Sequence, residues 1–365
     1  MIRLEKVTKC YGDTMAVDEL SIEINVGEVC VIIGPSGCGK TTTLRMINRL
    51  IEPTSGRIFV AGREILTAKA EQLRRSIGYA IQSVGLFPHM TVAANIAIVP
   101  ELLHWEKSRI VRRIEELLVL VGLDPTEHAS KYPNQLSGGE AQRIGVARAL
   151  AADPPIMLMD EPFGAVDPLT RERLQAQFIR IQQELKKTII LVTHDLDEAI
   201  RLGDRIAIME SGKLIQYDAP EAILAKPSNK FVRDFVGTDR ALKRLSRISI
   251  RSITKPSLSV SINAPIKTAY SACERCRLVW VVDNDNRLIG WIDWESLPEA
   301  SSIKEAIVRG GPDEIAVTDG ATLRETLSRM LGQGLKSIPV VNESGHLVGE
   351  VALSDIEAAT SETEA

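Results

Sequence analysis

The sequence lacks a long apolar run, a secretory leader and an excess of basic residues. No uncharged apolar stretch approaches the ~18 residues that a membrane-spanning helix needs. Residues 1–6 are charged and contain no apolar h-region, so we expect no secretory signal. The formal net charge is −4, which gives no support for binding nucleic acid through a basic surface. We therefore expect a cytoplasmic protein that reaches a membrane only through a partner.

Cysteine is scarce, and the chain has an odd number of cysteines. The five positions are Cys10, Cys30, Cys38, Cys273 and Cys276. An odd, scattered set in a cytoplasmic chain predicts free thiols. The last two have C-x-x-C spacing, but a structural zinc site needs a second pair of ligands, and the sequence offers none nearby. We expect this spacing to be a coincidence.

The length and composition indicate a soluble globular protein of two domains. The chain has 365 residues, of which 44% are hydrophobic and 25% are charged. Apolar and polar residues alternate over residues 2–7 and 16–24, which predicts antiparallel strands that lead into a buried strand at residues 28–33.

A glycine-rich phosphate-binding pattern follows that buried strand. Residues 34–41 read Gly-Pro-Ser-Gly-Cys-Gly-Lys-Thr, which matches the P-loop, and residues 41–47 begin a predicted helix. Glycine lets the backbone approach phosphates, and the N–H groups at a helix N-terminus attract anions. Lys40 supplies a positive charge to the β- and γ-phosphates, and the Thr41 hydroxyl can ligate Mg²⁺. The pattern predicts a site for a nucleoside triphosphate.

Three further apolar segments end in polar residues that suit phosphate or metal chemistry. Residues 77–81 lead to Gln82, residues 156–159 to Asp160 and Glu161, and residues 188–193 to His194. Such short apolar runs are typical of buried parallel strands, and ligands bind at the carboxyl ends of these strands. A strand-end histidine is usually structural, but here we expect several polar strand ends and the P-loop to converge.

A second anion-binding helix start is predicted after residue 136. Leu136 is followed by Ser137, Gly138, Gly139 and Glu140, and then by a helical segment at 141–150. Serine is a good N-cap, and the backbone N–H groups at the start of such a helix can bind an anion.

The order of these motifs resembles that of ATPase subunits of ABC transporters. The resemblance covers residues 1–237, and its most specific part is the Leu-Ser-Gly-Gly-Glu signature at 136–140. It implies an α/β fold of the P-loop NTPase type, with a RecA-like parallel core, an antiparallel β subdomain and an α-helical signature subdomain. The signature ends in Glu140 where Gln is commonest, and we expect no loss of activity from this variant.

The resemblance also implies roles for individual residues, with ATP and Mg²⁺ as the ligands. The implied catalytic residues are Glu161 as general base, His194 at the γ-phosphate and Gln82 as a γ-phosphate sensor. The implied metal ligands are Thr41, Gln82 and Asp160. The implied nucleotide-binding residues are Tyr11, Gly34, Pro35, Ser36, Gly37, Cys38, Gly39, Lys40, Thr41, Thr42, Ser137, Gly138, Gly139 and Asp167. From its position alone, Tyr11 is equally well read as a half-buried loop aromatic or as a platform for adenine.

In this family two chains would sandwich two ATP molecules head to tail. Ser137 and Gly139 would then bind the nucleotide held by the other subunit, and Asp167 would line the dimer interface. Closing the sandwich would move a membrane permease, next to which Gln82 would lie, and hydrolysis would reopen it. The implied location is peripheral, at the cytoplasmic face of the membrane.

A narrower resemblance concerns the transported solute. Residues 41–56 are similar to ATPase subunits of osmoprotectant importers, which take up glycine betaine, choline, carnitine or related quaternary amines delivered by an extracytoplasmic solute-binding protein. An importer for an amino acid or a polyamine stays open, because the solute never touches this subunit. A soluble ABC ATPase of translation or DNA repair is disfavoured, because the chain has one cassette and is acidic.

The C-terminal third contains an internal repeat after a basic segment. Residues 238–250 are predicted to be a helical linker, either solvated or in contact with anionic lipid. Residues 278–290 align with 337–349, each as a hairpin that ends in glycine, and an amphipathic helix at 322–331 precedes the second copy. This resembles a smaller α/β pair of CBS domains, with a degenerate first repeat at 251–300, a second at 301–360 and a tail at 361–365.

CBS pairs often bind adenine nucleotides, and the residues give a mixed signal here. The usual ribose-binding aspartate corresponds to Asp355 in the second repeat, whereas the matching position in the first repeat is Ser296. The serine disfavours nucleotide binding at the first half. Three roles stay open: a regulator that senses ionic strength or a nucleotide, a dimerisation module, and a vestige.

Overall fold

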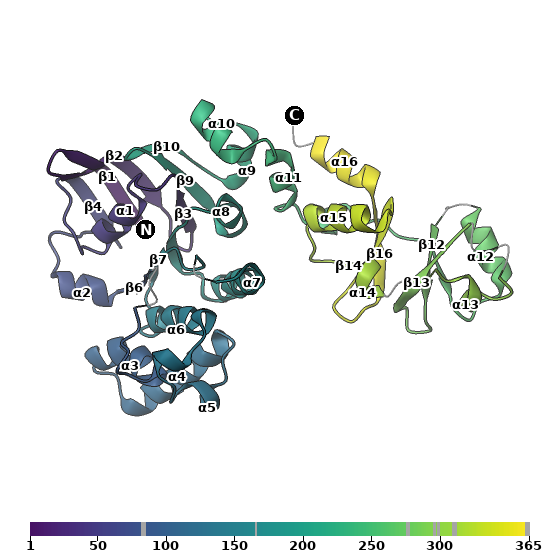
Figure 1. The fold of residues 1–365 in the computed structure, drawn as a ribbon, viewed down its shortest axis with the longest axis horizontal. Helices are drawn as coiled ribbons and strands as arrows, with labels where there is room; N and C mark the ends of the chain where they lie inside the picture. The colour runs from purple at the N-terminus through teal and green to yellow at the C-terminus, as the bar shows by residue number, and fades with distance from the viewer. Residues whose placement is uncertain are drawn as a thin grey trace. The chain divides into compact units, whose positions relative to one another are not determined.

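The chain folds into two compact units, Met1–Gly237 and Thr238–Ala365 (Figure 1). The structure, a computed structural model, describes residues 1–81, 85–164, 166–274, 278–294, 297, 300–308 and 312–361. None of the helices in these ranges is long and apolar enough to cross a membrane.

A six-stranded sheet forms the centre of the first unit. Its strands, in spatial order, are β10 (Lys213–Asp218), β9 (Arg205–Glu210), β3 (Val29–Ile33), β8 (Thr188–Val192), β7 (Ile156–Asp160) and β6 (Ile77–Ala80). All neighbouring strands pair in parallel except β10, which is antiparallel to β9. Every residue of β3, β7 and β8 is buried, because both faces of a parallel sheet are covered. The predicted strands that precede the P-loop, the acidic pair and the histidine are therefore direct neighbours.

Alternate residues of β3 enter two different hydrophobic cores. Val29, Val31 and Ile33 pack with the helices on one face of the sheet. Cys30 and Ile32 pack on the other face with helix α1 (Lys40–Ile47) and the antiparallel sheet. This alternation anchors the strand on both sides and fixes the position of the loop that follows it.

The predicted antiparallel strands form a separate four-stranded sheet. Its order is β2 (Thr14–Ile24), β1 (Ile2–Tyr11), β4 (Ser55–Val60) and β5 (Arg63–Glu64). Ile2 and Leu4 of β1 are buried opposite Ile24 and Ile22 of β2, whereas Arg3 between them is partly exposed. The alternation seen in the sequence therefore separates the core face from the outer face.

The helices of the first unit fall into two sets, one that forms a group of its own and one whose members lie around the sheets. The grouped helices are α3 (Val92–Leu102), α4 (Lys107–Leu120), α5 (Pro125–His128) and α6 (Gly138–Leu150) (Figure 1). The others are α2 (Ala70–Arg75), α7 (Pro168–Leu185), α8 (Leu196–Leu202), α9 (Pro220–Ala225) and α10 (Lys230–Val236), with a 3₁₀ turn, η1, at Pro133–Gln135. The predicted apolar face of α4, which includes Ile110, Ile114 and Leu117, is buried as expected.

Two similar three-stranded sheets form the second unit, so the internal repeat is confirmed. The first contains β11 (Ser259–Ser261), β12 (Leu278–Val282) and β13 (Leu288–Asp293), with helices α12 (Ile266–Cys273) and α13 (Ile303–Ala306). The second contains β14 (Val317–Thr318), β15 (Ser337–Val341) and β16 (Leu347–Ala352), with α14 (Pro312–Ile315), α15 (Leu323–Gln333) and α16 (Leu353–Ser361). The hairpins share one register, because Val281 pairs with Gly290 as Val340 pairs with Gly349.

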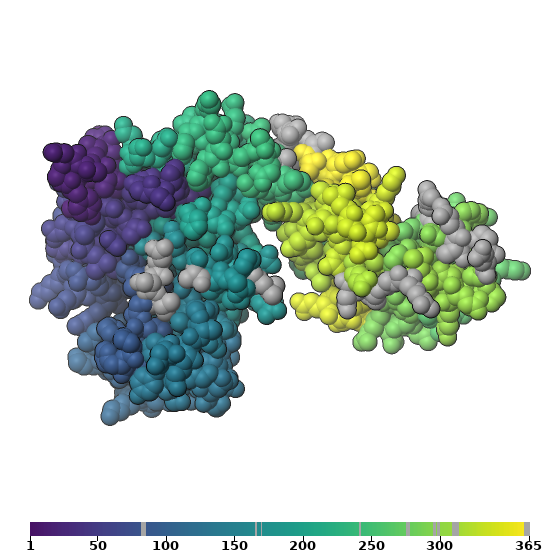
Figure 2. All heavy atoms as spheres, in the orientation of Figure 1, coloured from purple at the N-terminus to yellow at the C-terminus, as the bar shows by residue number. Residues whose placement is uncertain are grey.

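The two repeats pack against each other through a buried tryptophan. Trp280 of the first repeat is fully buried and lies in one apolar cluster with Ile315, which precedes β14. Its indole Nε1 donates to Oε2 of Glu350 on β16, at 2.7 Å. The two halves form a continuous body in the space-filling view (Figure 2). A single repeat would leave this face exposed, so the two copies fold as one unit.

The segment expected to be a linker belongs in part to the core of the second unit. Residues 240–245 form helix α11 (Arg240–Leu245), and a 3₁₀ turn, η2, covers Ile250–Ser252. Leu245 and Ile250 are buried with Leu323 of α15. The Ile250 amide also donates to the carbonyl of Ala321. The sequence did not indicate this packing, because the apolar residues that carry it are interspersed with basic residues.

Candidate nucleotide-binding and catalytic site

Two glycines of the P-loop stand where no side chain fits. A Cβ on Gly34, whose φ is +150°, would lie 2.1 Å from the carbonyl oxygen of Met209. A Cβ on Gly39, whose φ is +101°, would lie 2.4 Å from the carbonyl oxygen of Ala16. Both glycines are therefore required by backbone crowding. By contrast, a Cβ on Gly37 would meet no heavy atom within 4 Å, so that part of the loop is open to a ligand.

The N-terminus of α1 is arranged to receive an anion. Its N-cap residue, Gly39, supplies no side-chain hydrogen bond, and the first turn contains no acidic residue. Lys40 is buried, and its ammonium donates to the carbonyl oxygens of Gly34 at 2.7 Å and Pro35 at 2.9 Å. The loop thus holds a positive charge beside unpaired helix N–H groups, which fits a bound phosphate chain.

Thr41 and Asp160 meet beside the loop. The Thr41 hydroxyl donates to Oδ1 of Asp160, at 3.1 Å. The pKa of the Asp160 carboxyl is raised on balance, mainly because the group is buried. The hydrogen bond from Thr41 opposes this shift, and the neighbouring charge of Glu161 adds to it. A hydroxyl and a carboxylate oxygen are hard ligands that Mg²⁺ prefers. This pair therefore fits the predicted metal site.

Glu161 and His194 form a second direct contact. Oε1 of Glu161 lies 3.2 Å from Nδ1 of His194. The Glu161 backbone has a φ of +47°, and its amide donates to the carbonyl of Val192 at 2.8 Å. A left-handed glutamate is uncommon and marks a constrained position. The structure therefore brings the two predicted catalytic side chains together at adjacent strand ends.

Ser137 caps helix α6 in a reciprocal arrangement with Glu140. The Ser137 hydroxyl accepts from the Glu140 amide at 3.3 Å, and Oε2 of Glu140 accepts from the Ser137 amide at 2.7 Å. The Ser137 hydroxyl also donates to Oε2, at 2.8 Å, and the two bonds that the carboxylate accepts from Ser137 lower the pKa of Glu140 to about 2. The other carboxylate oxygen, Oε1, lies 3.2 Å from Nε2 of His128. The glutamate variant of the signature thus has a capping role.

This arrangement predicts different effects for two substitutions of Glu140. Glu140→Ala removes the acceptor for the Ser137 amide and is expected to cost about 1 kcal/mol of stability. Glu140→Gln keeps an acceptor oxygen and is expected to cost less than half as much. Thermal unfolding of both variants, with Glu184→Ala as an exposed control, measures this. Equal melting temperatures for the two Glu140 variants and the control would contradict the capping role.

Three more of the predicted residues, Tyr11, Asp167 and Gly139, have the following surroundings. Tyr11 ends β1, and its side chain is half exposed and thus accessible for stacking. Nζ of Lys9 lies 5.1 Å from the centroid of its ring. Asp167 is the N-cap of α7, where its carboxylate accepts from the Thr170 amide at 3.0 Å. A Cβ on Gly139 would lie 3.2 Å from Cγ2 of Thr170. Gln82 lies outside the described residues.

Sequence reasoning missed a polar network around His194. Asp195 caps α8 by accepting from the Glu198 amide, at 3.1 Å. The buried Thr193 hydroxyl donates to the buried Glu198 carboxylate, and burial raises the pKa of that carboxyl to about 7. An aspartate three residues before a glutamate is a capping signature that could have been read from the sequence.

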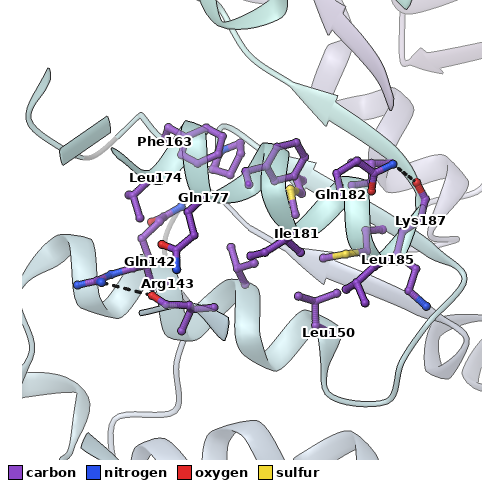
Figure 3. Close-up of a pocket in the computed structure, with 17 residues that line it drawn as sticks. Gln142, Arg143, Leu150, Phe163, Leu174, Gln177, Ile181, Gln182, Leu185 and Lys187 are labelled. Carbon is purple, nitrogen blue, oxygen red and sulfur yellow. Dashed lines mark hydrogen bonds between the residues drawn. The ribbon is translucent and has the colours of Figure 1, made fainter. Parts of the chain in front are cut away.

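An apolar cavity of about 40 Å³ lies within the first unit (Figure 3). Its lining comes mainly from α6, β7 and α7 and includes Gln142, Met159, Leu174 and Phe178. Among the described residues that line it, none belongs to the P-loop or to the Glu161–His194 pair. The cavity nevertheless borders the segment that carries the acidic pair, because Met159 precedes Asp160 and Pro162 follows Glu161.

Comparison with known proteins gives consistent matches for both units. A family model described as ABC transporter matches residues 17–164, and the CBS domain model matches residues 249–309 and 310–362. The chain is 46% identical to the osmoprotectant import ATP-binding protein OsmV of Salmonella typhimurium, over 96% of this chain and 94% of that protein. It is also 46% identical to the glycine betaine/carnitine/choline transport ATP-binding protein OpuCA of Bacillus subtilis, over 98% of this chain and 95% of that protein.

Solved structures resemble the first unit. A dimeric ATP-binding cassette in a post-hydrolysis state, bound to ADP and Pi, is 33% identical with a TM-score of 0.56. The match covers 60% of this chain and 98% of that chain. The cbiO1 protein of Clostridium perfringens, part of an ABC transporter complex, is 26% identical with a TM-score of 0.58, over 68% of this chain and 98% of that chain.

Proposed function

The chain belongs to the ATP-binding subunits of ABC transporters that carry CBS domains, and on that premise we propose that it hydrolyses ATP to energise import of a quaternary-amine osmoprotectant. Glycine betaine, choline and carnitine are the candidate solutes. The observation that carries this function is the near-complete alignment at 46% identity with proteins named for osmoprotectant, glycine betaine, carnitine and choline transport. The alignment includes the CBS pair as well as the ATPase unit, so it is more specific than a match to the cassette alone.

The geometry supports specific roles for this chain's own residues in hydrolysis. Lys40 and the N-terminus of α1 bind the phosphates, because they concentrate positive charge at the loop. Thr41 and Asp160 hold Mg²⁺, which when bound neutralises charge on the phosphates. Glu161 accepts the proton of the attacking water, and His194 orients the Glu161 carboxylate through their 3.2 Å contact.

We further propose that two copies of the chain form the complete site. Ser137 and Gly139, at the start of α6, would complete the nucleotide site of the second copy, with Asp167 between the two chains. Support comes from the two glycines that follow the N-cap Ser137 at this helix start, where the backbone carries no side chains, and from the dimeric cassette that resembles the first unit. The dimer would work at the cytoplasmic face of the membrane on permease subunits, which receive solute from an extracytoplasmic binding protein.

A regulatory role for the CBS pair is part of the proposal, through ionic strength or a nucleotide. Asp355 already has two partners: its carboxylate pairs with the Lys255 ammonium and accepts from the Ala352 amide at 2.9 Å. A ribose that used Asp355 would share the carboxylate with Lys255. Ser296, the matching position in the first repeat, lies outside the described residues.

Reconstitution with the permease and solute-binding protein tests the proposed solute. The chain is co-assembled in liposomes, and ATPase activity and uptake are recorded with glycine betaine, choline, carnitine, an amino acid and a polyamine, at low and high internal salt. We expect a response to at least one quaternary amine that increases with salt. A response without salt dependence would keep the importer and remove ionic strength as the signal of the CBS pair. A response only to the amino acid or polyamine would overturn the quaternary-amine assignment.

A further inference from the structure

Two loops of the ATPase site are joined at two points. One loop follows β7 and contains Glu161 and Val166, and the other follows β8 and contains His194. At the first point, the Glu161 carboxylate contacts the His194 ring. At the second point, Arg171 of α7 contacts both loops. Arg171 lies one turn into a helix whose N-cap is Asp167, so it is carried directly by the first loop.

Arg171 contacts one residue that follows β7 and one that follows β8. Its Nη2 donates to the carbonyl oxygen of Val166 at 3.4 Å, and its Nη1 donates to Oδ2 of Asp195 at 3.5 Å. The Arg171 and Asp195 side chains are 31% and 32% exposed. An ion pair between partly buried side chains is screened by salt less than one on the open surface.

Asp195 transmits that contact to the backbone on both sides of His194. Its carboxylate caps α8 through the Glu198 amide, and its own amide donates to the Thr193 hydroxyl at 3.1 Å. The Thr193 hydroxyl donates in turn to the Glu198 carboxylate, and the Thr193 amide donates a hydrogen bond to the carbonyl of Ile32. Every residue adjacent to His194 is therefore fixed, while the His194 side chain itself is 61% exposed.

We propose that Arg171 is a positioning residue for ATP hydrolysis: through Asp195 it holds His194 in register with Glu161. The inference rests on the proposed ATPase function and adds a residue that the motifs do not include. The guanidinium can bind a carboxylate and a carbonyl at the same time, which a point charge on a flexible stem does less well. A misplacement of about 1 Å at a reacting group can cost as much as 10²-fold in rate. Loss of Arg171 is therefore expected to reduce turnover while leaving ATP binding in place.

Steady-state ATPase kinetics of the full-length chain assembled with its permease test this role. Arg171→Met is expected to lower kcat about tenfold with KM for ATP within about twofold, because only positioning is lost. Arg171→Lys should restore part of kcat. Asp195→Asn, which retains an oxygen for the Glu198 amide, should reproduce the loss, and the double variant should be no worse than either single variant. Arg180→Met, on the exposed side of the same helix, is the matched control and should resemble wild type.

Epistasis with His194 distinguishes positioning from a separate role. In a His194→Ala background, Arg171→Met should change kcat less than twofold, because the group that Arg171 positions is absent. An equal tenfold loss in both backgrounds would overturn the positioning role and leave the ATPase function intact. Loss of folding in Arg171→Met would shift the test to Asp195→Asn, and wild-type kcat in that variant would overturn the proposal. An inactive wild-type assembly would instead contradict the proposed function itself.

Discussion

Replacing Glu161 with Gln is expected to leave ATP binding intact and to lower kcat by roughly 10³-fold. The expectation follows from general-base catalysis, which contributes roughly 10²–10⁴-fold and depends on the lost negative charge. Gln keeps the size of the side chain and can still contact His194, now 3.2 Å from the Glu161 carboxylate. The change therefore separates chemistry from structure.

Two measurements on the same sample check this effect. ATP affinity is measured by equilibrium titration, and turnover by phosphate release in the reconstituted complex. Glu184→Gln, an exposed change of the same kind on α7, provides the control. Turnover of Glu161→Gln at the wild-type level would rule out Glu161 as the base, whatever its position beside His194.

Replacing Lys40 with Ala is expected to weaken ATP binding by at least tenfold. The Lys40 ammonium is held within the loop by the carbonyls of Gly34 and Pro35. Residues 34–41 contain no other basic side chain, so nothing else in the loop replaces this charge. A hydrogen bond to a charged group is worth about 1.5–3 kcal/mol, and Lys40 would give at least one to the phosphates.

Titration in the Glu161→Gln background measures the affinity without loss of ATP during the experiment. Lys226→Ala, at an exposed lysine of the same unit, serves as the control for loss of one positive charge. If Lys40→Ala bound ATP as tightly as its parent, the P-loop assignment would be wrong. A lower affinity for ADP as well would show that the contact extends to the β-phosphate.

The sequence predicted the elements around the P-loop because their signals are local. β3, β7 and β8 are continuous apolar runs, and a run of that kind needs burial on both faces. The sequence predicted that the loop glycines let the backbone approach phosphates, whereas the structure shows that Gly34 and Gly39 are required by the nearby carbonyls of Met209 and Ala16. The shared register of the two repeated hairpins also followed from the sequence, because Gly290 and Gly349 align and make matching pairs. Each glycine lies inside its second strand, however, and does not end the hairpin as predicted.

Contacts between distant segments could not be predicted in the same way. The ion pair between Lys255 and Asp355 joins residues far apart in the sequence, and no local pattern indicates it. The same holds for Arg171, whose bond to Asp195 depends on how α7 and α8 pack. The burial of Leu245 and Ile250 was not predicted for a different reason. The charged residues around them are typical of an exposed linker, although these two side chains are buried.

ATP-dependent uptake of glycine betaine by proteoliposomes is the most direct test of the account. The liposomes contain the chain with its permease and solute-binding protein, and uptake is compared between wild type and Glu161→Gln at saturating ATP. The account predicts sustained uptake that requires ATP in wild type and almost none in the variant, although both bind ATP. Sustained uptake by Glu161→Gln at the wild-type rate, or wild-type uptake without ATP, would contradict it.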